Sequence, residues 1–284
     1  MITVACIQFS PEKAKLAANL DRIAALAKEA QGEGAEIVTF SESATSGYFV
    51  EGGAYECSLT SEELAGEISS RFKGSPALDF VIGFYERSGN QLFNSAAYLE
   101  WNGSETRAVH TYRKFYLPTY GVFDEERFVG RGTELGVFDT RFGRFAILIC
   151  EDVWHSILPT FCAVAGAEVL FVPSASPGRG FASERPSNLT RYEALLSSIS
   201  QEHGIFCVNA QLCGFEGGKG FVGGSLMTDP TGRVMGQGPL MEEHILIGQI
   251  DLDQVGIARA QSPLISDLRG TWSDLLRMAE SISP

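Results

Sequence analysis

The chain has 284 residues, 44% of them hydrophobic, which is enough to bury a sizeable core. Asp and Glu outnumber Lys and Arg by 35 to 22, so the formal net charge is −13. Phosphate binding needs clustered Lys and Arg, which this sequence lacks, so we expect no nucleic-acid partner. A small-molecule substrate is the better expectation.

The N-terminal residues 1–15 lack the basic segment, apolar run and cleavage site of a secretory signal. No apolar run approaches the roughly 18 residues of a membrane span, so no membrane partner is expected. The six cysteines are widely spread and form no CxxC pair. That spacing is typical of reduced thiols, and it predicts a cytoplasmic protein.

Short apolar or alternating runs predict strands along the whole chain. In chain order they are residues 2–9, 36–40, 78–86, 92–101, 106–113, 144–150, 167–174, 204–211, 223–230 and 244–251. Helical patterns separate several of them, at residues 16–31, 61–72, 155–167 and 187–204. This interleaving predicts an α/β fold, with layers of mixed sheet covered by helices.

We expect one domain over residues 1–284, because no linker, charge block or long repeat interrupts the pattern. The glycine-dense segment 214–224 lies between two predicted strands and matches no phosphate-binding motif. It is predicted to form a flexible turn near a site.

Cys150 ends the buried strand predicted at 144–150, just before a helix. Ligands bind at the carboxyl ends of strands in α/β folds, where backbone N–H groups can also receive an oxyanion. Free cysteines are often inert core residues, however. The position of Cys150 alone therefore does not decide between a nucleophile and a core residue.

A nucleophilic cysteine usually has a histidine partner. The candidates are His110, His155, His203 and His244. His155 lies in the helix predicted after Cys150, which makes direct contact awkward, and no local Cys/His motif is present. A Cys/His site remains an alternative.

Glu42 and Lys114 follow two other predicted strands. A carboxylate could take the thiol proton and later activate water, while an ammonium could stabilise a tetrahedral oxyanion. Each residue alone is more simply explained as a solvated charge. The order of the motifs around them favours function.

Three motifs occur in succession: VTFSES at 38–43, YRKFYLPTYGVFDEERFVGRG at 112–132 and LICEDVW at 148–154. With them the chain resembles the nitrilase, or carbon–nitrogen hydrolase, superfamily over nearly its whole length. The resemblance implies a four-layer α-β-β-α sandwich with mixed sheets. It also implies a homodimer or larger assembly, for which the amphipathic residues 267–284 could dock on a neighbouring subunit.

By the same resemblance, Glu42 is the general base, Lys114 the oxyanion stabiliser and Cys150 the nucleophile. Glu125, eleven positions after the lysine, would orient Lys114. The backbone N–H of Glu151 would join the lysine in holding the oxyanion. Attack on an amide would release ammonia or an amine and leave a thioester for water to hydrolyse, so no metal or other cofactor is expected.

Within the superfamily, residues 117–128 and 149–154 look most similar to the glutamine amidase domain of glutamine-dependent NAD synthetases. Residues 188–196 and 214–225 suggest the same branch. No ATP-pyrophosphatase domain follows before Pro284. We therefore expect a stand-alone amidase, whose ammonia could pass to a separate synthetase.

The predicted substrate contacts are Tyr120, Phe123, Ser174 and Ser176. Glutamine, another small amide and an N-carbamoyl amine or amino acid would all suit the same chemistry. A nitrile is less expected, because Glu151 and Asp152 replace the Cys-Trp-Glu pattern of nitrilases. The alternative from another class is a catalytically silent oligomeric binding or regulatory protein that keeps the fold.

Overall fold

Two six-stranded mixed sheets lie face to face in the computed structural model, which describes residues 1–179, 186–216 and 218–282. The first sheet has the order β14 (His244–Ile250), β1 (Ile2–Gln8), β2 (Ile37–Thr39), β3 (Leu78–Ser88), β4 (Gln91–Trp101) and β5 (Thr106–Arg113). The second has the order β13 (Val234–Gln237), β12 (Leu226–Thr228), β9 (Phe206–Gln211), β8 (Val169–Ser174), β7 (Arg144–Ile147) and β6 (Val137–Asp139). In each sheet the three strands β1–β2–β3 or β7–β8–β9 are parallel, and the remaining pairs are antiparallel.

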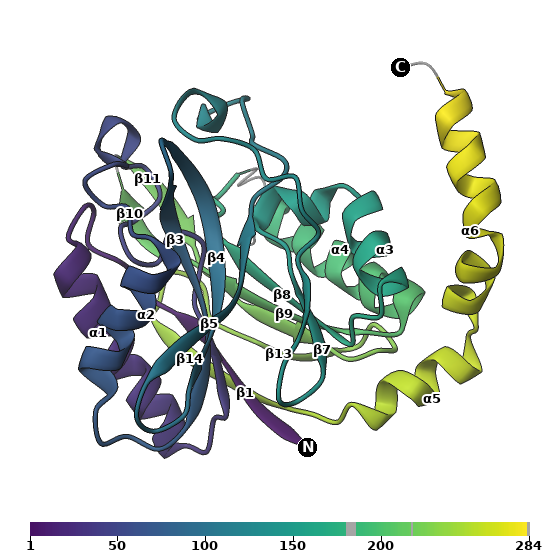
Figure 1. Ribbon diagram of the computed structural model, residues 1–284, viewed down its shortest axis with the longest axis horizontal. Helices are drawn as coiled ribbons and strands as arrows, with labels where there is room; N and C mark the ends of the chain where they lie inside the picture. The colour runs from purple at the N-terminus through teal and green to yellow at the C-terminus, as the bar shows by residue number, and fades with distance from the viewer. Residues whose placement is uncertain (180–185, 217, 283–284) are drawn as a thin grey trace.

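Helices cover the outer face of each sheet, which gives the expected α-β-β-α order of layers (Figure 1). The first sheet is covered by α1 (Leu16–Gly32) and α2 (Ser61–Phe72), and the second by α3 (Ile157–Val164) and α4 (Ser187–His203). Val4 and Cys6 of β1 face the core between the sheets, while Ala5 and Ile7 pack under the helices. Central strands are therefore buried on both faces, which explains their nearly unbroken apolar runs.

Two predicted elements beside the cysteine have different bounds in the structure. The strand predicted at 144–150 ends at Ile147, and Cys150 begins a 3₁₀ helix, η3 (Cys150–Trp154). The helix predicted at 155–167 covers only Ile157–Val164, so His155 lies outside it. A run of apolar residues predicts that a segment is buried, but it does not show at which residue the strand ends.

The glycine-dense segment 214–224 was also predicted incorrectly as a flexible turn. It contributes most of a hairpin, β10 (Cys213–Glu216) and β11 (Lys219–Val222), with Cys213 opposite Val222 and Gly214 opposite Phe221. Gly217 lies outside the described residues. The pairing of β10 with β11 orders this segment, and its high glycine content did not indicate this pairing.

The chain ends in α5 (Asp253–Gln261) and α6 (Leu264–Ser281), which stand at the edge of the molecule in Figure 1. In α6, Trp272 packs against Phe161 of α3 with ring centroids 5.7 Å apart, and Ile265 is buried. Leu276 and Met278 remain exposed. No helix within the described ranges is long and apolar enough to cross a membrane.

Gly83 of β3 lies against the turn that follows β2. A Cβ at this position would lie 2.4 Å from the backbone oxygen of Ser41 and 2.7 Å from the Cα of Glu42. Only a glycine lets β3 approach this turn so closely.

We predict that Gly83→Ala lowers the free energy of unfolding by about 1–3 kcal/mol, because the added methyl forces the backbone apart. Gly66→Ala is the matched control, since Gly66 is exposed within α2 and has open space around it. It should stabilise the protein by up to about 1 kcal/mol through helix propensity. Urea unfolding measures both, and equal effects would contradict this explanation of Gly83.

Candidate functional site

Glu42 lies in the buried turn after β2 and has no exposed surface. Its Oε1 accepts hydrogen bonds from Lys114 Nζ at 2.7 Å and Asn94 Nδ2 at 2.8 Å. Its Oε2 accepts one from the backbone N–H of Ala175 at 2.9 Å. The carboxylate thus links both sheets, because Asn94 lies on β4 and Ala175 directly follows β8.

Lys114 directly follows β5 and is fully buried. Its Nζ lies 2.7 Å from Oε1 of Glu42 and 2.7 Å from Oε1 of Glu125, and the Tyr48 hydroxyl also donates to Glu125. Burial lowers the pKa of Lys114, but the charges of Glu125 and Glu42 more than offset this and hold it well above its ordinary value. The lysine is therefore a fixed positive charge.

Glu125 opens the short 3₁₀ helix η2 (Glu125–Arg127) and is 8% exposed. Burial raises its pKa to about 7, against the lowering effect of Lys114. The three charged side chains have a net charge of −1 when both carboxyls are ionised. A proton on Glu125 is therefore easy to accommodate near neutral pH.

Cys150 has φ +47°, in the left-handed region that non-glycine residues rarely adopt. Such strain is often found at active sites. Its Sγ lies 3.2 Å from the hydroxyl of Tyr192. Burial raises the pKa of the thiol, Glu42 raises it further, and Lys114 lowers it. Burial thus favours the protonated thiol over the thiolate.

Asp152 holds the cysteine turn against the segment that follows β5. Its Oδ1 accepts the backbone N–H groups of Phe115 and Tyr116 at 3.2 and 2.8 Å. Its Oδ2 accepts the Tyr112 hydroxyl at 2.9 Å and the Ile149 N–H at 3.0 Å. One buried carboxylate thus positions the backbone beside both the lysine and the thiol.

Tyr120, Glu151 and Arg179 form a more exposed group, which we call the Tyr120 cluster. The Tyr120 hydroxyl donates to both carboxylate oxygens of Glu151, at 3.0 and 2.9 Å. The Arg179 guanidinium carbon lies 5.8 Å from the ring centroid of Tyr120 and 5.5 Å from that of Phe123. No carboxylate of the described residues pairs with this guanidinium.

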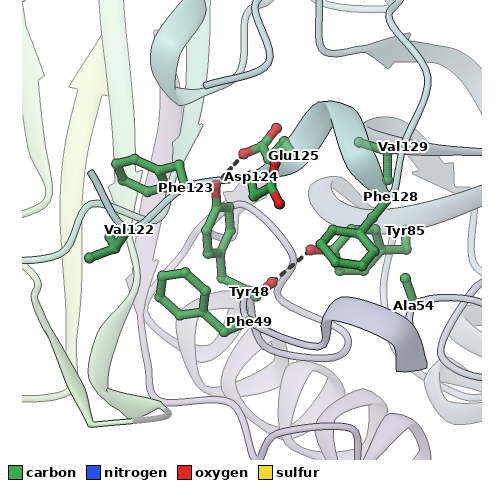
Figure 2. Close-up of a pocket in the computed structure, with 10 residues that line it drawn as sticks. All are labelled: Tyr48, Phe49, Ala54, Tyr85, Val122, Phe123, Asp124, Glu125, Phe128 and Val129. Atoms are coloured by element: carbon green, nitrogen blue, oxygen red, sulfur yellow. Dashed lines mark hydrogen bonds between the residues drawn. The ribbon is translucent and has the colours of Figure 1, made fainter. Parts of the chain in front are cut away.

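A cavity of about 260 Å³ adjoins Glu125 (Figure 2). Its wall is mainly aromatic and aliphatic, and it consists of Tyr48, Phe49, Ala54, Tyr85, Val122, Phe123, Asp124, Glu125, Phe128 and Val129. A second cavity of about 490 Å³ shares Val122 and Phe123 with it and is also lined by Arg179 and the β10–β11 hairpin. Phe123 therefore lies between the two cavities.

The structure brings some of the predicted site residues together but not all of them. Lys114 pairs with both Glu42 and Glu125, and the charges of Glu42 and Lys114 shift the pKa of the Cys150 thiol in opposite directions. Glu151 is the second residue of η3, so its N–H belongs to a first turn that has no partner within the helix. Their catalytic roles remain predictions.

Ser174 and Ser176 line neither cavity. The Ser174 hydroxyl accepts from Asn209 Nδ2 at 3.0 Å, and that of Ser176 accepts from Asn188 Nδ2 at 2.9 Å. Their predicted substrate contacts would have to be made in addition to these bonds.

The histidines contribute nothing to the cluster. His155 stacks on Tyr116 with ring centroids 3.7 Å apart, and His110 stacks on Phe138. Among the residues that the structure describes, none of the histidines hydrogen-bonds the thiol. This geometry supports a carboxylate rather than a histidine as the base.

Sequence reasoning missed Asp152 and Arg179. Asp152 lies in the third motif, but acceptance of four hydrogen bonds is visible only in three dimensions. Arg179 comes three residues after Ser176, in the segment where the substrate contacts of the two serines were predicted. This position in the sequence could have indicated it as a further substrate contact.

The carbon–nitrogen hydrolase family model matches residues 3–260, and the chain belongs to this family of hydrolases acting on carbon–nitrogen bonds. It is 32% identical over 244 residues to the glutamine-dependent NAD(+) synthetase of Xylella fastidiosa, covering 82% of this chain but 41% of that protein. It is 28% identical over 282 residues to a nitrilase of Pyrococcus abyssi, covering 96% and 97% of the two chains. A carbon–nitrogen hydrolase from Helicobacter pylori superposes with a TM-score of 0.83 at 23% identity, covering 97% and 98%, and shows the same fold.

We predict that Asp152→Asn lowers the free energy of unfolding by about 2–4 kcal/mol, because an amide NH₂ must then face two donors. Asp139→Asn is the control, since Asp139 is largely exposed and its contact with Arg144 is 3.4 Å long. It should change stability by less than about 0.5 kcal/mol. Urea unfolding of both variants is the measurement. An Asp152→Asn variant as stable as the wild type would show that the four hydrogen bonds of Asp152 contribute little to stability.

Proposed function

We propose that the chain is a thiol amidohydrolase that hydrolyses the side-chain amide of a small amino-acid amide, glutamine foremost, to a carboxylate and ammonia. The observation that supports this best is the buried ammonium of Lys114, held between Glu42 and Glu125 beside the Cys150 thiol. A fixed positive charge in a dry site stabilises an oxyanion far better than one in water.

In the proposed first half-reaction, Cys150 Sγ attacks the amide carbonyl carbon while Glu42 takes the thiol proton. A free thiolate beside a net negative cluster is unfavourable, so proton transfer accompanies attack. Lys114 and the N–H of Glu151 stabilise the tetrahedral oxyanion. Glu42 then returns its proton to the leaving nitrogen, and ammonia departs as the thioester forms.

In the second half-reaction, Glu42 takes a proton from water as the hydroxide attacks the thioester. The second oxyanion uses the same lysine and N–H. The carbon–sulfur bond breaks, the thiol regains its proton from Glu42, and the carboxylic acid product leaves. One base thus serves both steps because it is neutralised and regenerated in each.

The Tyr120 cluster supports an amino-acid amide as substrate. The Glu151 carboxylate suits an α-ammonium. The guanidinium of Arg179, which pairs with no carboxylate among residues 1–179, 186–216 and 218–282, suits an α-carboxylate. Simple aliphatic amides offer neither charge. The Xylella relative is named as glutamine-dependent, which supports the same choice for this chain.

The remaining predictions about the protein's surroundings rest on the sequence alone. They are a homodimer or larger assembly, a cytoplasmic location and a separate synthetase that uses the released ammonia. An N-carbamoyl amine substrate and a catalytically silent binding protein are the alternatives that the first experiment separates.

We predict that the wild-type protein releases ammonia from glutamine, and that Cys150→Ala lowers kcat by about 10⁴-fold or more because the covalent route is lost. The assay should include asparagine, propionamide, N-carbamoylputrescine and a nitrile. Cys6→Ala is the control, because Cys6 is also buried but lies on β1 in the core. Full activity in Cys150→Ala would disprove the mechanism, and activity on the carbamoyl compound alone would change the substrate. If no compound is hydrolysed, the silent binding protein becomes the better interpretation.

We predict that Arg179→Met raises KM for glutamine by about 10–100-fold and leaves kcat nearly unchanged, because one charge-assisted contact is lost. Its action on propionamide should not change. Arg191→Met is the matched control. Arg179 and Arg191 both lie over the ring of Trp154, at 5.9 and 4.5 Å from its centroid, but Arg191 lines neither cavity. Equal effects of the two variants would show that Arg179 only packs against aromatic rings.

A further inference from the structure

Glu216, at the end of β10, is a buried carboxylate with no part in the proposed chemistry. Only 4% of its surface is exposed. Its Oε2 accepts the backbone N–H groups of Tyr48 at 2.8 Å and Phe49 at 3.0 Å. A carboxylate that accepts two backbone donors fixes the position of that backbone.

The chain is shaped to receive this carboxylate. Gly47 has φ +78°, and a Cβ there would lie 2.8 Å from Oε1 of Glu216. Glycine at this position satisfies both the conformation and the space. Gly47 and Glu216 lie far apart in the sequence, so the fit is a tertiary feature.

The segment fixed by Glu216 leads directly to the lysine. The Tyr48 hydroxyl donates to Oε1 of Glu125, and the same oxygen accepts from Lys114 Nζ at 2.7 Å. On the other side of Tyr48, its backbone oxygen accepts the hydroxyl of Tyr85 at 2.7 Å, as Figure 2 shows. Glu216 therefore binds the backbone N–H of Tyr48, and Tyr85 binds its backbone oxygen.

This anchoring matters because residues 40–50 leave β2 without entering another strand. Buried N–H groups in such a segment need acceptors from elsewhere. Without Glu216, two of them lose their acceptor and the segment must shift. A displacement of about 1 Å in a positioning group can cost on the order of 100-fold in rate.

We propose that Glu216 is a positioning residue for amide hydrolysis: it fixes Tyr48, whose hydroxyl holds Glu125 against the ammonium of Lys114. This inference rests on the proposed function. It gives the β10–β11 hairpin an indirect role in catalysis, because Glu216 contacts the backbone of Tyr48 and Phe49 and none of the proposed reacting groups.

The test compares Glu216→Ala, Glu216→Gln, Tyr48→Phe and the double variant Glu216→Ala/Tyr48→Phe in the ammonia-release assay. Glu216→Ala should lower kcat by about 10–100-fold with KM changed by less than about threefold. Glu216→Gln should recover most of the activity, because its side-chain oxygen can still accept both N–H groups. Asp79→Ala is the control, as it removes a buried carboxylate bound to Tyr98 and Arg141, away from the site. It should lose stability but keep kcat.

The double variant decides whether Glu216 acts through Tyr48. If it does, the double variant is about as slow as the slower single variant, because both changes break one path. Multiplicative losses in kcat, or a Glu216→Ala variant as fast as wild type, would overturn the inference while leaving the proposed function intact.

If the wild-type protein hydrolyses none of the amides, the proposed function fails and the network is measured on the thiol instead. Alkylation of Cys150 by iodoacetamide then replaces turnover as the readout. Equal changes in alkylation rate in Glu216→Ala and Tyr48→Phe support the positioning path. Unchanged rates in Glu216→Ala overturn it.

Discussion

Lys114 has no exposed surface, and an ammonium removed from water costs several kcal/mol unless charges and hydrogen bonds replace its solvation. Glu42 and Glu125 provide that replacement, each from 2.7 Å. They belong to different loops, one after β2 and the other in η2. The lysine can therefore be buried only when both segments are folded against it. The folding of these segments and the proposed catalysis thus depend on the same three charges.

The same cluster explains why the cysteine differs from a thiolate paired with histidine. The ammonium of Lys114 and the carboxylate of Glu42 act on Cys150, and burial raises the pKa of the thiol. In the proposed mechanism, the resting site therefore holds a neutral thiol near the carboxylate that acts as its base. In the proposed mechanism, the thiol loses its proton only as it attacks the substrate carbonyl, so the unliganded protein would carry little reactive thiolate.

Buried carboxylates also determine the shape of the surrounding loops. Asp152 accepts two backbone N–H groups after β5 and one before the thiol, Glu216 accepts two after Gly47, and Glu42 accepts that of Ala175. Buried loop N–H groups that find no backbone acceptor need an acceptor from a side chain.

The sequence by itself determined the local elements and the residue types of the site. The capping box of Thr60 and Glu63 begins α2 at the predicted residue, and alternating or continuous apolar runs located the main strands. The ordered motifs around Glu42, Lys114 and Cys150 identified the family. Only the tertiary structure decided that Cys150 lies in a strained turn rather than in the strand, and that Glu216 reaches Tyr48 across 168 residues. Periodicity and motifs report on near neighbours in the chain, whereas the partners of a buried charge are chosen by packing between distant segments.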